Sequence, residues 1–265
     1  EKAVEALRAD LEKQGGTLKR HPYLSYAYVI EKTDDLTQLS GFEEGAFVIQ
    51  DISSMLAVEA LGLPKMDNQG TLKILDICAA PGGKSMLAAD ILNHADIDYM
   101  LEARDISEYK VELMQENFNR CHLNKAKAVA WDALEPDERW LGQADVVIAD
   151  IPCSGLGVIG RKRDIKYKMT PQAVQDIVEL QEKILKVAAS YVKKGGKLLF
   201  STCTVNKDEN EAHVKWIQDT LKMTPVSLNG TLPGLVHSPT TQQGFVQLIP
   251  GMQDTDGFFI SVFEK

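Results

Sequence analysis

The sequence predicts an α/β fold in which a doubly wound, mostly parallel sheet of seven strands follows a small N-terminal α/β extension. Short apolar runs alternate with segments of helical periodicity from residue 71 onward, and this alternation is typical of parallel sheets. Little sequence separates the last two runs, so we expect them to pair as a hairpin-like edge. The expected strands are 72–77, 98–103, 126–131, 145–150, 197–202, 245–249 and 258–263.

Helix starts are indicated by capping residues that precede an apolar periodicity, namely Asp51 or Ser53, Ser107 and Thr170. Pro171 suits the first turn of the helix that Thr170 would cap. Two short β-like runs, 26–30 and 46–49, precede the regular region. The expected helices are 1–14, 51–61, 84–94, 107–121, 170–192 and 206–221.

Composition is that of a globular protein, with 44% hydrophobic and 25% charged residues among 265, enough for one large core and a small appendage. We place a small α/β extension or linker at residues 1–45 and the main domain at 46–265. No apolar run approaches the length of a membrane span and no signal peptide opens the chain, so we expect no membrane partner.

The cysteines and histidines argue against disulfides and metals. The four cysteines show no CxxC and no tight pairing, which favours free thiols and a cytoplasmic location. The five histidines are scattered, and Cys121-His122 has no partners at ligand spacing, so we expect no metal.

Charge is distributed unevenly along the chain. The net charge of −9 argues against broad, non-specific binding of nucleic acid. Residues 151–200 nevertheless carry ten Lys or Arg against four Asp or Glu, a local +6. A basic run is usually a solvated loop, but this one begins eight residues after Cys153, so a polyanion that reached this cysteine would pass it. The candidate RNA-binding residues are Arg161, Lys162, Arg163, Lys166 and Lys168.

Two cysteines follow the carboxyl ends of expected strands, where open α/β sheets bind ligands. Cys153 stands in Asp150-Ile151-Pro152-Cys153-Ser154-Gly155, and Cys203 stands in Ser201-Thr202-Cys203-Thr204. A free cysteine is most often a small buried hydrophobe. Two thiols at two strand ends suggest covalent chemistry on a bound substrate.

The segment 76–85 joins the first expected sheet strand to its helix and offers a glycine-rich turn to a ligand. A Walker A loop would need glycine where Cys78 stands, and the G-x-G-x-x-G of a dinucleotide site is absent from this turn. The string does occur at residues 155–160, but no helix follows it there, so we interpret that match as a flexible loop.

S-adenosylmethionine suits the segment better, because this cofactor carries a sulfonium cation and no phosphate. Asp105 would accept the ribose hydroxyls, with Glu102 as a rival, and Asp132 would accept the adenine amino group. Asp76 and Asp150 follow two further strands. Each aspartate alone is more simply explained as a cap or turn residue, but carboxylates at four strand ends together favour a cofactor site.

These motifs together resemble the m5C RNA methyltransferase family of the Sun (Fmu) or RsmB type, which acts on small-subunit (16S) ribosomal RNA. The resemblance runs from about Phe47 to the end of the chain. It implies a Rossmann-like, class I SAM-dependent methyltransferase fold. It rests on the segments 50–54, 76–84 (AAPGGK), 103–107, 150–155, 164–166, 201–204 and 256–259.

The resemblance also implies roles for individual residues. Cys203 would be the nucleophile, Cys153 would help to release the product, and Asp150 would hold the cytosine. Lys84 would belong to both the catalytic and the cofactor-binding sets. The cofactor-binding set that we predict is Cys78, Ala79, Ala80, Pro81, Gly82, Gly83, Lys84, Arg104, Asp105, Asp132 and Asp150.

Arg104, Arg163 and Thr204 depart from the residues usual in the family, and none of them removes a reacting group. Family members also carry an N-terminal NusB-like RNA-binding domain, which is absent here, so we expect a truncated chain or a shorter protein.

Several alternatives stay open at the level of sequence. From the residues alone, Pro152-Cys153 would serve equally well as the nucleophile. The chain could be an RNA-binding assembly factor on an inactive methyltransferase fold, or it could act on tRNA or another rRNA. Asp-Ile-Pro-Cys is also similar to the motif of amino-methyltransferases, although a cysteine replaces their stacking aromatic residue.

Overall fold

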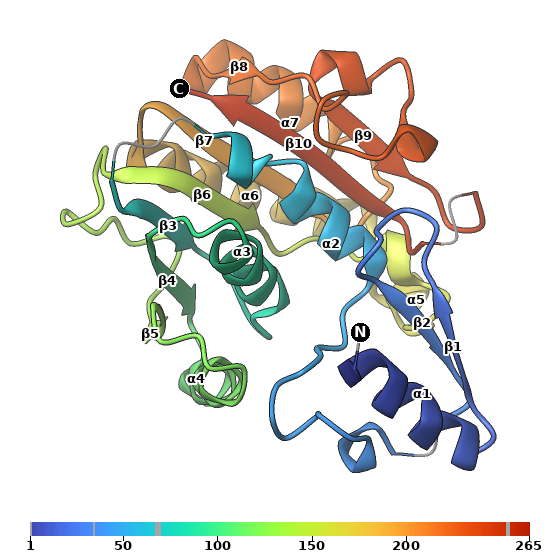
Figure 1. Cartoon of the computed structure of the whole chain (residues 1–265). Coiled ribbons are helices and arrows are strands. Elements are labelled where there is room, and N and C mark those ends of the chain that lie inside the picture. Colours follow the sequence, from blue (N-terminus) through green and yellow to red (C-terminus); the bar gives the residue numbers. More distant parts are fainter. Residues whose placement is uncertain (1, 34, 67–69, 253–254) are drawn as a thin grey trace.

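One large twisted sheet organises the computed structural model, which describes residues 2–33, 35–66, 70–252 and 255–265 (Figure 1). Its order is β5-β4-β3-β6-β7-β10, and both β8 and β9 pair with the free side of β10. The sheet is therefore seven positions wide. Strands β3 to β7 are parallel, and β10 is antiparallel to β7. The strands are β3 (Leu72–Asp76), β4 (Tyr99–Asp105), β5 (Ala126–Ala130), β6 (Ala144–Asp150), β7 (Val192–Thr202), β8 (Thr224–Pro225), β9 (Phe245–Leu248) and β10 (Phe258–Glu264).

Helices cover both faces of this sheet, as Figure 1 shows. One face carries α2 (Ile52–Glu59), α3 (Gly83–His94) and α4 (Glu108–Arg120), and the other carries α6 (Pro171–Tyr191) and α7 (Glu211–Trp216). A short helix, α5 (Ile165–Lys168), lies in the basic segment. Among the described residues, no helix is long and apolar enough to cross a membrane. The remaining turns are 3-10 helices at Leu36–Gln38, Leu63–Lys65, Leu156–Val158, Gly234–Val236 and Thr241–Gln243 and a π-helical turn at Ile217–Leu221.

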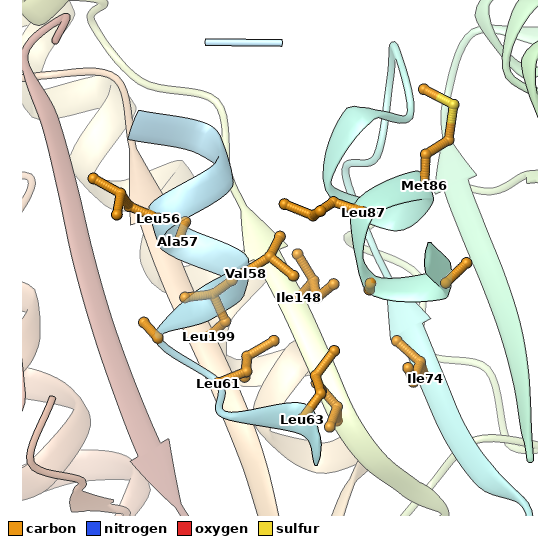
Figure 2. Packing of buried hydrophobic residues seen from close by; sticks show 14 of the residues in the cluster. Leu56, Ala57, Val58, Leu61, Leu63, Ile74, Met86, Leu87, Ile148 and Leu199 are labelled. Atoms are coloured by element: carbon orange, nitrogen blue, oxygen red, sulfur yellow. The ribbon is translucent and has the colours of Figure 1, made fainter. Parts of the chain in front are cut away.

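The central strands are apolar throughout because both of their faces are buried. Ile74 and Ile148 face the layer of α2 and α3, whereas Leu75 and Val147 face the layer of α6. In Figure 2 Val58 of α2 and Leu87 of α3 point toward each other beside Ile148. This packing fixes the carboxyl ends of β3, β6 and β7 side by side at one edge.

The N-terminal segment forms its own small unit, in which α1 (Lys2–Lys13) packs on the antiparallel pair β1 (Thr17–Arg20) and β2 (Tyr28–Glu31). Leu7, Leu11 and Leu18 form its core. Hydrogen bonds join this unit to the large sheet domain, such as that from the Tyr26 hydroxyl to Glu59 at 2.6 Å.

The fold confirms the predicted class, and the differences are local. Residues 46–49 form no strand, whereas Thr17–Arg20, which we did not predict, pairs with β2. β7 begins at Val192, directly after α6, rather than at residue 197. The helix expected over 206–221 begins only at Glu211, because the Asn206 side chain accepts the Asp208 N–H in a turn and the Asn210 side chain donates to the Thr204 carbonyl. The last two strands do pair, but β10 lies inside the sheet rather than at its edge.

Candidate active site

The loop between β3 and α3 holds residues 77–82 against the end of the neighbouring strand. The Ala79 N–H donates to the carbonyl of Arg104 at 2.7 Å, and the Ser85 hydroxyl donates to Asp76 at 2.7 Å. Gly82 precedes α3 with φ of 99°, a left-handed conformation that favours glycine. The predicted cofactor-binding residues 78–84 thus lie together at the start of α3, where backbone N–H groups lack intrahelical partners.

Four aspartates surround this loop, as their effect on Cys78 shows. Burial raises the pKa of the Cys78 thiol, and the charges of Asp76, Asp150, Asp105 and Asp132 raise it further. Asp76 is itself buried, and burial raises its pKa to about 7. Carboxylates from four strand ends therefore all act on the same thiol, and a negative field of this kind suits a cationic ligand without phosphate.

Polar atoms without partners also mark the loop as a binding site. Within the described part of the chain, Gln50 Nε2 and Asp76 Oδ1 are buried and make no hydrogen bond. A Cβ atom at Gly83 would lie only 3.3 Å from Gln50 Nε2, so the Gln50 amide lies directly against the loop. A donor and an acceptor left unsatisfied beside four carboxylates fit the amino-acid part of S-adenosylmethionine.

Lys84 and Asp150 form an ion pair at the mouth of the site. Lys84 Nζ lies 2.6 Å from Asp150 Oδ2 and 3.2 Å from the Ser54 hydroxyl, and it stands 5.2 Å from the centre of the Phe258 ring. The Ser201 hydroxyl donates to the other Asp150 oxygen at 2.8 Å. The Asp150 side chain is 29% exposed, so it remains accessible to a ligand although it is paired with Lys84.

The two strand-end cysteines are in contact, with their sulfur atoms 3.3 Å apart. Because β6 and β7 are parallel neighbours, Asp150 lies opposite Ser201, and the two loops leave the sheet side by side. The Cys153 thiol, placed as a donor to Cys203, lowers the pKa of Cys203, and the charge of Lys84 lowers it further. The same bond, together with burial, raises the pKa of Cys153. With the proton of the shared contact on Cys153, the thiolate therefore forms more readily at Cys203.

The basic segment lies beside the cysteines but is not a free loop. Gly157 donates to the carbonyl of Cys203 at 3.0 Å and accepts from the Gly257 N–H at 2.9 Å. A Cβ at Gly157 would lie 2.1 Å from the Gly257 oxygen, so only glycine fits there. The loop at residues 155–160, which we predicted to be flexible, is therefore packed against the segment that carries Cys203.

Arg161, Lys162 and Arg163 are all exposed, and Arg161 is held by two carboxylates, Asp51 at 2.8 Å and Asp256 at 3.2 Å. The side chains of the remaining candidates, Lys166 and Lys168, lie outside the described atoms.

Arg104 differs most from its predicted role. Its side chain is 1% exposed and bonds to Glu102 at 2.7 Å and Asp137 at 2.5 Å, beneath the Trp131 ring. The guanidinium therefore binds protein carboxylates, and only the Arg104 carbonyl reaches the cofactor loop. The same pairing occupies Glu102, which leaves Asp105 as the ribose candidate at this strand end.

Sequence reasoning missed a buried group behind the cysteines. Glu209 and Gln181 are both fully buried and bond to the loops that carry Cys153 and Cys203. Their position in a polar turn and in an amphipathic helix gave no signal of this contact.

An open, mostly parallel sheet with these strand-end carboxylates defines a Rossmann-like methyltransferase of class I. The crystal structure of a methyltransferase homolog from Pyrococcus horikoshii superposes with a TM-score of 0.78 at 25% identity, over 99% of this chain and 82% of that one. The structure of NSun6 from the same organism with SFG gives a TM-score of 0.72 at 27% identity, over 90% and 59%.

Residues 63–264 match the family described as 16S rRNA methyltransferase RsmB/F, and the chain belongs to this family. A probable ribosomal RNA small subunit methyltransferase B of Bacillus subtilis is 39% identical over 84% of this chain and 49% of its own length. Methyltransferase B of Vibrio cholerae is 35% identical over 97% and 55%, and methyltransferase F of Cronobacter sakazakii is 29% identical over 99% and 55%. The chain spans about half the length of the curated relatives that it matches.

Proposed function

We propose that the chain transfers a methyl group from S-adenosylmethionine to C5 of a cytosine in small-subunit ribosomal RNA, through a covalent bond between Cys203 and C6 of the base. The observation that carries this proposal is the contact of two thiols, 3.3 Å apart, beside the Lys84–Asp150 pair. Relatives named methyltransferase B and F supply the substrate class.

Each step follows from a residue in this site. The Cys203 thiolate adds to C6, and electron density moves to C5, which becomes nucleophilic. Bound S-adenosylmethionine supplies the methyl group, and residues 79–84, Asp105 and Asp132 hold it. Asp150, backed by Lys84, holds the N3 and N4 edge of the base. A general base then removes the proton from C5 of the cytosine. The bond between C6 and the Cys203 sulfur breaks, and Cys203 leaves as the thiolate. Cys153, in contact with Cys203, assists this release.

The RNA approaches over the basic segment, where Lys162 and Arg163 are exposed. The base must leave its stack to reach the thiols, which costs least in single-stranded RNA. We propose the cytoplasm as the location, because free thiols stay reduced there.

Methyl-labelled S-adenosylmethionine and small-subunit rRNA test the proposal, with the wild type beside Cys203→Ala and Cys153→Ala. We expect label in 5-methylcytosine with the wild type, none with Cys203→Ala, and a covalent RNA adduct with Cys153→Ala. Adducts from the Cys203 variant alone would reverse the two roles. Label on tRNA only would change the substrate. Cofactor binding without any transfer would favour an inactive RNA-binding factor.

A further inference from the structure

A fully buried carboxylate connects the two cysteine loops behind the site. Glu209 Oε2 accepts the backbone N–H of Ser154 at 2.8 Å and the Gln181 amide at 3.2 Å. Glu209 Oε1 accepts the Ser154 hydroxyl at 2.5 Å and lies 3.3 Å from the Thr204 hydroxyl. Ser154 and Thr204 also bond to each other at 2.8 Å.

These bonds matter because of which residues they hold. Ser154 directly follows Cys153, and Thr204 directly follows Cys203. The register of β6 and β7 brings the two strand ends together, but the cysteines lie beyond the paired residues, where the ladder no longer fixes the backbone. Beyond the ladder, Glu209 therefore links the two loops, together with the Ser154–Thr204 contact and the bond from the Gly157 N–H to the Cys203 carbonyl.

We infer that Glu209 is a positioning residue that sets the contact between the Cys153 and Cys203 thiols. Its side chain is 0% exposed, and within the described residues no lysine or arginine bonds to it, so its partners are the two loops and Gln181. Gln181 also donates to the carbonyl of Pro152 at 2.9 Å, so α6 supports the same loop from behind.

The distance between the Cys153 and Cys203 sulfur atoms determines how Glu209 would affect the reaction. Release of the product needs Cys153 close to the sulfur that is bonded to the base, and a displacement of about 1 Å can cost two orders of magnitude in rate. Glu209 thus acts on both thiols without touching the base. This meaning of the contact rests on the proposed function, whereas the geometry itself can be tested without RNA or cofactor.

The test is the rate at which diamide oxidises the Cys153–Cys203 pair. Diamide takes one hydrogen from each thiol and becomes the hydrazine, and a disulfide forms, which peptide mass spectrometry detects. We expect Glu209→Ala to slow this step by about tenfold or more, because the thiols lose their fixed contact. The matched control is Asp145→Asn, which removes another buried carboxylate from the opposite end of β6 and should stay within about twofold.

Each outcome decides the inference. Disulfide formation at the wild-type rate in a folded Glu209→Ala protein overturns it, as does equal slowing by Asp145→Asn. If Glu209→Ala does not fold, Thr204→Val is used instead, since it removes only the hydroxyl on the Cys203 side. A rate unchanged in Thr204→Val would then overturn the inference, and a severalfold loss would support it.

A second readout uses the reaction. We expect Glu209→Ala to lower kcat while KM for RNA stays nearly constant and to accumulate adduct as Cys153→Ala does, with Glu209→Gln restoring most of the rate. If Glu209→Ala forms the disulfide at the normal rate but methylates differently, the positioning role is refuted. If Glu209→Ala forms the disulfide slowly and the protein shows no methylation at all, the positioning role stands and the proposed function is refuted.

Discussion

Replacing Lys84 by Met tests how much the ion pair between Lys84 and Asp150 contributes to the stability of the fold and to the pKa of Cys203. The substitution keeps most of the aliphatic stem and removes the ammonium that lies 2.6 Å from Asp150. Asp150 would keep only the Ser201 hydroxyl at 2.8 Å as a partner among the contacts that the structure describes.

The loss of stability on breaking this pair depends on how deeply the Lys84 and Asp150 side chains are buried. Removing one partner of a buried pair costs about 3–5 kcal/mol, and breaking an exposed pair costs about 0–1 kcal/mol. With side chains 10% and 29% exposed, this pair lies between these limits. We expect the free energy of unfolding to fall by about 2 kcal/mol, which lowers Tm by roughly 4 to 8 °C in a chain of this length.

Urea unfolding of wild type, Lys84→Met, Asp150→Asn and the double variant gives the coupling energy between the two residues. The rate of Cys203 alkylation against pH gives a second measure, obtained in the Cys153→Ala background so that only one of the two thiols reacts. Since the charge of Lys84 lowers the pKa of Cys203, its removal should move the midpoint of this profile to higher pH. A coupling energy near zero together with an unmoved midpoint would refute our account of Lys84.

Three further predictions concern pH and charge. Burial raises the pKa of Asp76 to about 7, so this residue stabilises the fold most below pH 4, and that contribution, up to about 4 kcal/mol, is lost as pH rises through 7. Urea unfolding of Asp76→Asn should show a flatter profile between pH 4 and 7, and an identical profile would contradict the assignment. Burial lowers the pKa of His213 to about 4, so stability is full above pH 6.5 and falls as pH drops toward 4; His213→Phe should unfold less readily than wild type at pH 5. The double variant Lys162→Glu, Arg163→Glu should weaken RNA binding and flatten its salt dependence, with S-adenosylhomocysteine affinity unchanged; equal RNA affinity would remove this segment from the RNA path.

The sheet and its strand-end residues could be predicted because they depend on local patterns. Asp105, Asp150 and Cys203 each follow an apolar run, and parallel strands bring such residues to one edge whatever the details of packing. Periodicity, together with the Thr170 cap and Pro171, also located α6 to within a residue or two.

Long-range contacts could not be predicted in this way. Glu209 meets Ser154 across 55 positions, and a buried carboxylate looks like a surface one in a polar turn. The buried ion pairs of Arg104 were missed for the same reason, because its partner Asp137 lies 33 positions away. The fragment at 46–49 has strand composition, but among the described residues it pairs with no strand.

The placement of β10 between β7 and the pair β8 and β9 has a consequence for how the protein is made. On the ribosome, β6 and β7 can join as soon as β7 and the turn after it have emerged, which brings the two thiols together before the last strands are made. β7 nevertheless keeps one unpaired edge until residues 258–264 emerge, and the Phe258 ring reaches Lys84 only then. During this interval the nascent chain carries a pair of free thiols beside an unpaired strand edge. Chaperones and reductants would protect the chain most in this interval.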